Sequence, residues 1–153
     1  MKILHGHDAE VAGFVAALIP NCARGFANYR ATGILDDDGK LIAGVVYHNW
    51  EPEAGVIEMS SASVSAHWLT RKVLREIFGY PFRIGCQMIV FRVSERNTGL
   101  HRQFDALGLR RHVIPRLYGR DEAGIVFTLT DDDWSAGRFM RQSRGKTQST
   151  NTA

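Results

Sequence analysis

The segment RNTGLHRQFDALGL, residues 96–109, indicates how the second half of the chain folds. Leu100, Phe104 and Leu107 stand at positions i, i+4 and i+7, which is the spacing of one helical face. Asn97 suits the N-cap, because its side chain can accept hydrogen bonds from N–H groups two or three residues on. The glycine after Leu107 favours a stop, so the segment predicts a helix over residues 97–107.

Periodicity and turn residues divide the rest of the chain in the same way. Asp8 suits the N-cap of an early helix, residues 36–40 form a strong turn signal, and Pro81 is expected to stop the second helix. We expect strands over residues 2–5, 31–35, 41–47, 56–60, 86–93, 109–118 and 125–130, and helices over residues 9–18, 67–79 and 97–107.

This order of elements predicts an α/β (α+β) fold with a mixed, mostly antiparallel, twisted sheet and helices on both faces. Residues 56–93 form a strand-helix-strand unit, whose two strands should be a central parallel pair with a right-handed connection. Such sheets bind ligands at the carboxyl ends of strands, next to helix N-termini.

Length and charge suggest one domain with an appendage. Nineteen basic and 16 acidic residues give the 153-residue chain a net charge of +3. Residues 138–153 contain four basic residues and no acidic one, so the body has a net charge of −1. We therefore expect a single domain over residues 1–134 and a polar, basic, disordered tail over 135–153, and a nucleic-acid partner is not favoured.

Cysteine usage and hydropathy bear on location. Cys22 and Cys86 are far apart and outside any CxxC motif, so we expect reduced packing residues in a cytoplasmic protein. No segment has the pattern of a secretory signal or a membrane span. His5 and His7 have no further ligand at matching spacing, and no metal is expected.

The segment at 96–109, with its Asn, the aromatic residue seven positions on and the following Leu-Gly-Leu, resembles the motif that closes the acyl-CoA site of GNAT-type N-acetyltransferases. The strand over 88–93 and Asp133-Trp134 are also similar to that family, and the resemblance covers residues 2–134. Small members encoded by phages and prophages are the most similar. The resemblance implies transfer of an acetyl or other short acyl group from acetyl-CoA to a primary amine in a ternary complex, and a possible homodimer.

The resemblance also implies a set of residues around acetyl-CoA. The pyrophosphate loop of the family falls on residues 64–69, where its glycines are missing, although Ser65 and Ala66 are small and Arg71 and Lys72 could add charge. Asn97 would bind the pantetheine arm. The expected cofactor-binding residues are Met59, Ser60, Ser61, Ser65, Ala66, His67, Trp68, Leu69, Thr70, Arg71, Lys72, Asn97 and Phe104.

Glu58 lies inside an apolar strand, where an ionised carboxylate needs partners or a cleft. In similar acetyltransferases a glutamate on this strand is the general base for the acceptor amine. Alternatively, Glu58 pairs with an arginine such as Arg92. Backbone amides near residues 59–61 are expected to polarise the thioester carbonyl.

Phe104 stands where many family members have a tyrosine that protonates the leaving thiolate. Another group, such as Tyr118 or Tyr47, could supply the proton, or none is needed because the CoA thiolate leaves well. As a structural residue, Phe104 would pack on the pantetheine arm and the core.

Residues for the acceptor are expected at the end of the strand over 41–47. His48, Asn49 and Trp50 follow it and are the candidate substrate residues, although a Trp near a turn is often a packing lid. The chain could also be a non-catalytic GNAT-fold module that binds acyl-CoA or nucleic acid, because the glycine-free loop and Phe104 fit lost chemistry.

Overall fold

The computed structural model describes residues 1–20 and 22–137, which belong to two compact units divided after Cys86. In the part described, the first unit contains β1 (Lys2–Leu4), α1 (Asp8–Leu18), β2 (Arg30–Leu35), β3 (Leu41–Glu51), β4 (Val56–Ser63) and α2 (Arg71–Arg83). The second contains β5 (Met88–Ser94), α3 (Thr98–Ala106), β6 (Arg110–Ile114), β7 (Gly124–Thr130) and α4 (Asp131–Ala136).

In the first unit the strands pair antiparallel in the order β1-β2-β3-β4. The β2–β3 turn forms where its sequence predicted it. The Asp36 carboxylate accepts from the backbone N–H groups of Asp38 and Lys40, at 3.0 and 2.9 Å, and Gly39 takes a φ of 79°. An Asp side chain that bonds to N–H groups ahead of it, followed by a left-handed Gly, is typical of a tight hairpin turn.

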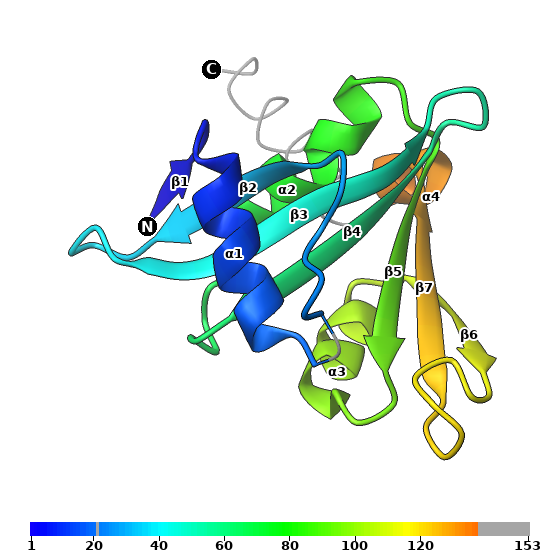
Figure 1. Cartoon of the computed structure of the whole chain (residues 1–153). Coiled ribbons are helices and arrows are strands. Elements are labelled where there is room, and N and C mark those ends of the chain that lie inside the picture. Colours follow the sequence, from blue (N-terminus) through cyan, green and yellow to red (C-terminus); the bar gives the residue numbers. More distant parts are fainter. Residues whose placement is uncertain (21, 138–153) are drawn as a thin grey trace, which may run out of the picture. The chain divides into compact units, whose positions relative to one another are not determined.

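Helix α1 lies against β2 and β3, in front of them in Figure 1. Val11 and Val15 are fully buried, and they face the strands at Gly33 and Gly44. A Cβ atom at Gly44 would lie only 2.7 Å from Val15 Cγ2 and 2.8 Å from Val11 Cγ1. The two glycines therefore let the helix approach the strands closely.

Helix α2 lies on the other face of the same strands, behind them in Figure 1. The Tyr47 hydroxyl of β3 donates a buried hydrogen bond of 2.6 Å to the Ile77 carbonyl oxygen of α2. Pro81 has no N–H for that carbonyl, so Tyr47 supplies the missing donor. The predicted stop at Pro81 is therefore wrong, because the helix continues through it to Arg83.

The starts of both helices in this unit also differ from the prediction. The helix predicted from His67 begins at Arg71, because the Thr70 side chain caps it by accepting from Val73 N–H at 3.3 Å. Asp8 is the first residue of α1 and not its cap. His7 holds the cap position without a side-chain hydrogen bond.

The second unit is built on β5, β7 and β6, which pair antiparallel in that order. Phe104 of α3 is buried, with its ring 4.7 Å from that of Phe91 and 5.1 Å from that of Phe127. The predicted N-cap is confirmed, since the Asn97 side chain accepts from Leu100 N–H at 3.3 Å. The aromatic residue in the 96–109 segment is thus part of this unit's core.

Several strands and the C-terminal tail begin or end at other residues than the sequence predicted. The third and fourth strands run on to Glu51 and Ser63, because antiparallel pairing between them continues past the predicted ends. The strand predicted over 109–118 is limited to its paired residues, 110–114. The predicted tail begins inside α4, which Thr130 caps by accepting from Asp133 N–H, and residues 138–153 of that tail lie outside the described residues.

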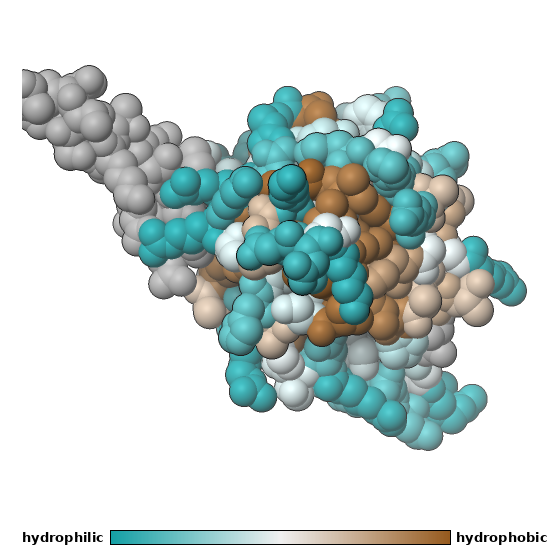
Figure 2. Space-filling view, turned by 90° about the vertical axis from the view of Figure 1, so that its left-hand side faces the viewer, coloured by the Kyte–Doolittle hydropathy of each residue, from teal (hydrophilic) through white to brown (hydrophobic). Residues whose placement is uncertain are grey.

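Figure 2 faces the side on which β1 and the β2–β3 turn lie in Figure 1. Hydrophobic residues gather in the middle of this face, and hydrophilic residues surround them (Figure 2). In the first unit, Leu4 and Leu41 are only partly buried and pack on the core formed by α1 and the strands. Some apolar surface of this core is thus left accessible.

Candidate active site

Four polar side chains meet where β3 and β4 run side by side. His48 pairs directly with Glu58, and the next pair on the same face is Val46 with Ser60. Because partners in an antiparallel pair share a face, His48, Glu58 and Ser60 lie on one face of the strands. This is also the face of Gly44, against which α1 packs.

The distances connect these groups into a chain. His48 Nε2 and Ser60 Oγ lie 2.8 Å apart in a hydrogen bond, and His48 Nε2 is 3.6 Å from Glu58 Oε2. The His48 and Glu58 side chains are only 11% and 14% exposed. The Phe26 ring covers the imidazole, with its centroid 4.9 Å away. We call His48, Asn49, Glu58 and Ser60 the Glu58 cluster.

Asn49 reaches Glu58 through an irregularity in β3. Regular pairing with β4 is interrupted between His48 and Glu51, and Asn49 takes a φ of 50°. Asn tolerates this left-handed conformation better than most residues, and a bulge commonly redirects a side chain. As a result, Asn49 Nδ2 donates to Glu58 Oε1 at 2.9 Å.

The arrangement meets the requirement for a carboxylate inside an apolar strand. An ionised carboxylate in such a place is costly unless hydrogen bonds replace water. One Glu58 oxygen accepts from an amide, and the other faces an imidazole that Ser60 orients. Chemically, the Glu58 cluster can hold a carboxylate in one orientation, from which it could accept a proton from a bound group.

Trp50, the third residue expected near the acceptor, is 53% exposed and is not a buried packing lid. Burial raises the pKa of the Cys86 thiol, and a hydrogen bond from the Trp50 side chain lowers it in part. Cys86 is a buried free thiol, as expected of a packing residue, while Cys22 is a half-buried free thiol.

The loop before α2 is held by serine side chains. Ser65 N–H donates to Ser63 Oγ at 2.9 Å, and His67 N–H donates to Ser65 Oγ at 3.4 Å. Ala66 and His67 are exposed, whereas the Trp68 side chain is buried. Arg71 and Lys72 are exposed and open α2, in the turn where a helix has free N–H groups.

The remaining expected residues fall in different places. Met59 is buried and pairs with Tyr47, whereas Ser61 pairs with Val45 and is half-buried. Leu69 and Thr70 are half-buried and precede α2. Asn97 and Phe104 belong to the second unit, where the first caps α3 and the second packs in the core.

The structure argues against Tyr47 as the group that protonates the leaving thiolate in a reaction at the Glu58 cluster. Tyr47 and His48 are consecutive on a strand, so their side chains point to opposite faces. The Tyr47 hydroxyl already donates to the Ile77 carbonyl. Burial, followed by the nearby negative charge of Glu76, raises the pKa of Tyr47. Its proton is therefore held tightly, and the hydroxyl lies on the face of β3 opposite to the Glu58 cluster. Tyr118 stays a prediction.

Sequence reasoning missed the side-chain role of Ser60, which was expected to act through its backbone. The signal was present in the alternation of β3 and β4, because His48, Glu58 and Ser60 share a face once the two strands are in register. The register depends on the turn over 52–55, and the pattern of the strands does not fix it.

The described residues contain neither a candidate metal site nor a candidate membrane span. Among residues 1–20 and 22–137, no group of three or more His, Cys, Asp or Glu side chains could hold a metal ion. None of the helices in this part of the chain is both long and apolar enough to cross a membrane.

The likeness to known proteins lies in three-dimensional structure. No family model and no curated protein matches the chain. A protein of Acinetobacter baylyi to which acetyltransferase activity is attributed matches with a TM-score of 0.67 at 14% identity, over 86% of this chain and 93% of that one. The ribosomal-protein-S5-alanine acetyltransferase of Vibrio fischeri matches with a TM-score of 0.58 at 18% identity, over 69% and 63%.

A third solved structure, a mutant form of the spermidine/spermine N-acetyltransferase of Vibrio cholerae, matches with a TM-score of 0.61 at 14% identity, over 76% of this chain and 72% of that one. At these identities the likeness shows the fold. The chain has the fold of solved acetyltransferases, and the predicted fold class is confirmed.

Proposed function

We propose that this protein is an N-acetyltransferase that transfers an acetyl or other short acyl group from acetyl-CoA to a primary amine. The observation that carries the proposal is the largely buried Glu58 carboxylate, 14% exposed, held by Asn49 and facing His48, in a chain with an acetyltransferase fold. Acetyl-CoA is a co-substrate here, and no metal enters the proposal.

In the proposed reaction the acceptor nitrogen attacks the thioester carbonyl directly. Glu58 takes a proton from the acceptor ammonium, the C–N bond forms, and the C–S bond breaks with its electron pair leaving on the CoA thiolate. The second proton of the attacking nitrogen goes to the thiolate or to water. Asn49 and His48 keep the carboxylate oriented, which lowers the cost of reaching the attacking geometry.

Backbone N–H groups near residues 59–61 would bind the developing oxyanion, as the resemblance implies. The pyrophosphate would lie at the loop and first turn formed by Ser65, Ala66, His67, Trp68, Leu69, Thr70, Arg71 and Lys72. Asn97 would bind the pantetheine arm, and Phe104 would line it. The serine-held loop and the two exposed cations support this placement of the pyrophosphate.

The test is Glu58→Gln, which keeps the shape and removes the base. We expect kcat to fall about 100-fold or more, while the affinity for acetyl-CoA measured by calorimetry stays unchanged. The matched control is Glu53→Gln, because Glu53 is an exposed glutamate outside the Glu58 cluster. An unchanged kcat across the pH range would remove Glu58 from the mechanism.

The amine itself is proposed only as a class. The solved enzymes that share the fold include one named for an alanine of ribosomal protein S5 and one named for spermidine and spermine. A panel containing an alanine peptide, spermidine and simple alkylamines, followed by release of the CoA thiol, would identify the acceptor class. We also propose a cytoplasmic protein that forms a homodimer, which light scattering would test. One spermidine N-acetyltransferase with this fold is described as dodecameric.

A non-catalytic acyl-CoA or nucleic-acid module is the second candidate. It is favoured by Phe104, which is buried among other rings and cannot donate a proton. Binding of acetyl-CoA without thiol release on any amine would support it. Absence of acetyl-CoA binding would argue against both the enzyme and an acyl-CoA module.

A further inference from the structure

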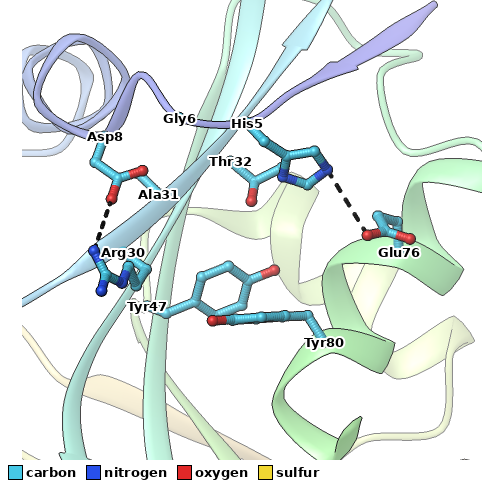
Figure 3. A pocket seen from close by; sticks show the side chains of 9 residues that line it. All are labelled: His5, Gly6, Asp8, Arg30, Ala31, Thr32, Tyr47, Glu76 and Tyr80. Carbon is cyan, nitrogen blue, oxygen red and sulfur yellow. Dashed lines mark ion pairs between the residues drawn. The ribbon is translucent and has the colours of Figure 1, made fainter. Parts of the chain in front are cut away.

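A cavity of about 280 Å³ opens in the first unit, beside α2 and away from the Glu58 cluster. Nine residues line it, and Figure 3 shows them around the opening. They are His5, Gly6, Asp8, Arg30, Ala31, Thr32, Tyr47, Glu76 and Tyr80. Tyr47 lines this cavity and its neighbour His48 belongs to the Glu58 cluster, so the two places lie on opposite faces of β3.

The floor of the cavity is aromatic and fixed. The Tyr47 and Tyr80 rings lie with centroids 5.0 Å apart at an angle of 58°. The Tyr47 hydroxyl donates to Ile77 and interacts with the Thr32 side chain, so it is already satisfied. Tyr47 is only 2% exposed, so the ring surface open to a ligand is mainly that of Tyr80, which Tyr47 holds in place.

The walls carry two carboxylates, and each lies near basic side chains. Glu76 Oε1 lies 3.2 Å from Arg83 Nη2, outside the lining, and 3.9 Å from His5 Nε2 on the cavity side. Asp8 lies 3.6 Å from Arg30 Nη1. Figure 3 marks the His5–Glu76 and Arg30–Asp8 pairs, and in each of them the acid is less exposed than its basic partner. With histidine neutral, the lining has a net charge of −1.

We propose that this cavity binds a small organic cation that carries a primary ammonium group. Tyrosine ring faces attract cations, and a carboxylate beside them can accept the ammonium hydrogens. An anion would be repelled by the Asp8 and Glu76 carboxylates. A neutral apolar molecule would offer the Glu76 carboxylate no hydrogen-bond donor. A cavity of this volume suits a small ligand, being at the lower limit for drug-sized ones.

The experiment is a titration of the full-length protein with n-butylammonium chloride at low ionic strength, followed by amide NMR shifts and calorimetry. Two probes of similar length, 1-butanol and sodium butyrate, replace the ammonium by a neutral and by an anionic group. We expect saturable binding of butylammonium at one site, and at least about tenfold weaker binding of both other probes.

Substitutions test whether butylammonium binds in this cavity or elsewhere on the protein. Glu76→Gln and Tyr80→Leu should weaken butylammonium binding about fivefold or more, whereas Tyr80→Phe keeps the ring and should keep most of the affinity. The controls are Glu10→Gln, an exposed carboxylate of α1 outside the lining, and Glu58→Gln. Both should bind like the unchanged protein, with circular dichroism confirming that every variant is folded.

Four outcomes would overturn the proposal. These are no saturable binding, butyrate or butanol binding as tightly as butylammonium, no effect of Glu76→Gln or Tyr80→Leu in folded protein, and loss of binding in Glu58→Gln. The last outcome would place the ammonium at the Glu58 cluster and would support the proposed acetyl transfer instead. Failure of the cavity proposal and failure of the proposed acetyl transfer therefore give different experimental results.

Discussion

Tyr47 shows how one hydroxyl can complete a helix that its own sequence would interrupt. The Ile77 carbonyl would be a buried acceptor without a partner, because the residue four positions on is Pro81. The 2.6 Å bond from Tyr47 supplies the donor and also fixes α2 to β3. Removing the hydroxyl therefore leaves an unsatisfied carbonyl behind.

We expect Tyr47→Phe to lower the free energy of unfolding by about 1–3 kcal/mol, measured by urea denaturation. Tyr29→Phe is the control, because the Tyr29 hydroxyl makes no hydrogen bond with the described residues, and it should change stability little. Equal stability of the two variants would show that the Ile77 carbonyl finds another donor.

The same residue predicts an alkaline limit to stability. The pKa of Tyr47 is raised in the folded protein, first by burial and then by Glu76. Below about pH 10 a tyrosine keeps its proton in the unfolded chain as well, so the contribution of Tyr47 to the free energy of unfolding is fully present. As the pH rises further, only the unfolded chain ionises easily, so stability falls. Urea midpoints at about pH 8 and pH 11 should differ less for Tyr47→Phe than for the unchanged protein.

Single residues were predicted best where their role is local. The Asn97 cap is a hydrogen bond to a residue only three positions on, so the local sequence is enough to predict it. Glu58 was singled out because a charge inside an apolar strand needs an explanation. Its partners Asn49 and His48 come from another strand, and the bulge that aims Asn49 follows from pairing that no local pattern reveals.

At the scale of elements, close packing of α1 on the strands depends on Gly33 and Gly44. Gly44→Ala would force its new methyl group against Val11 and Val15. We expect a loss of about 1–3 kcal/mol in stability, measured by thermal or urea unfolding.

Gly13→Ala is the matched control for that substitution. Gly13 lies inside α1, and a Cβ atom there meets nothing within 4 Å. The change should stabilise the protein by about 0.5–1 kcal/mol, since alanine favours the helix and restricts the unfolded chain. If both substitutions acted in the same direction, the close approach of α1 would not be limiting.

The elements themselves were largely predictable, and their ends were not. Periodicity identified α2 and α3, because one face of each helix is apolar, whereas α1 was predicted from Asp8 as a cap and from Pro20 as a stop. The end of α2 depended on Tyr47, 30 residues before the helix carbonyl that it satisfies. Helix α4 has no buried residue, so hydrophobic spacing could not reveal it, and the Thr130 cap was the remaining signal.

At the scale of the whole molecule, charge is divided unevenly along the sequence. Residues 138–153 lie outside the described residues and contain Arg138, Arg141, Arg144 and Lys146, while residues 1–137 have a net charge of −1. An overall charge of +3 therefore says little about the part of the chain with the acetyltransferase fold.

We expect replacement of these four basic residues by glutamine, in the full-length chain, to remove whatever weak DNA affinity the protein has. The slope of log affinity against log salt should fall by up to about 3 to 4. Turnover and the melting temperature should not change. Loss of turnover would instead assign the basic residues a part in acetyl transfer, and DNA affinity that survives the replacement would point to the folded units.

Two consecutive residues of strand β3 point to opposite faces: Tyr47 lines the cavity, and His48 belongs to the Glu58 cluster. Substitutions along β3 alter one face at a time. A single inserted or deleted residue before Tyr47 would exchange the faces of both, and it would separate the tyrosine from α2 and the imidazole from Glu58 at once. Homologous chains should therefore vary in amino acid along this strand while keeping its length.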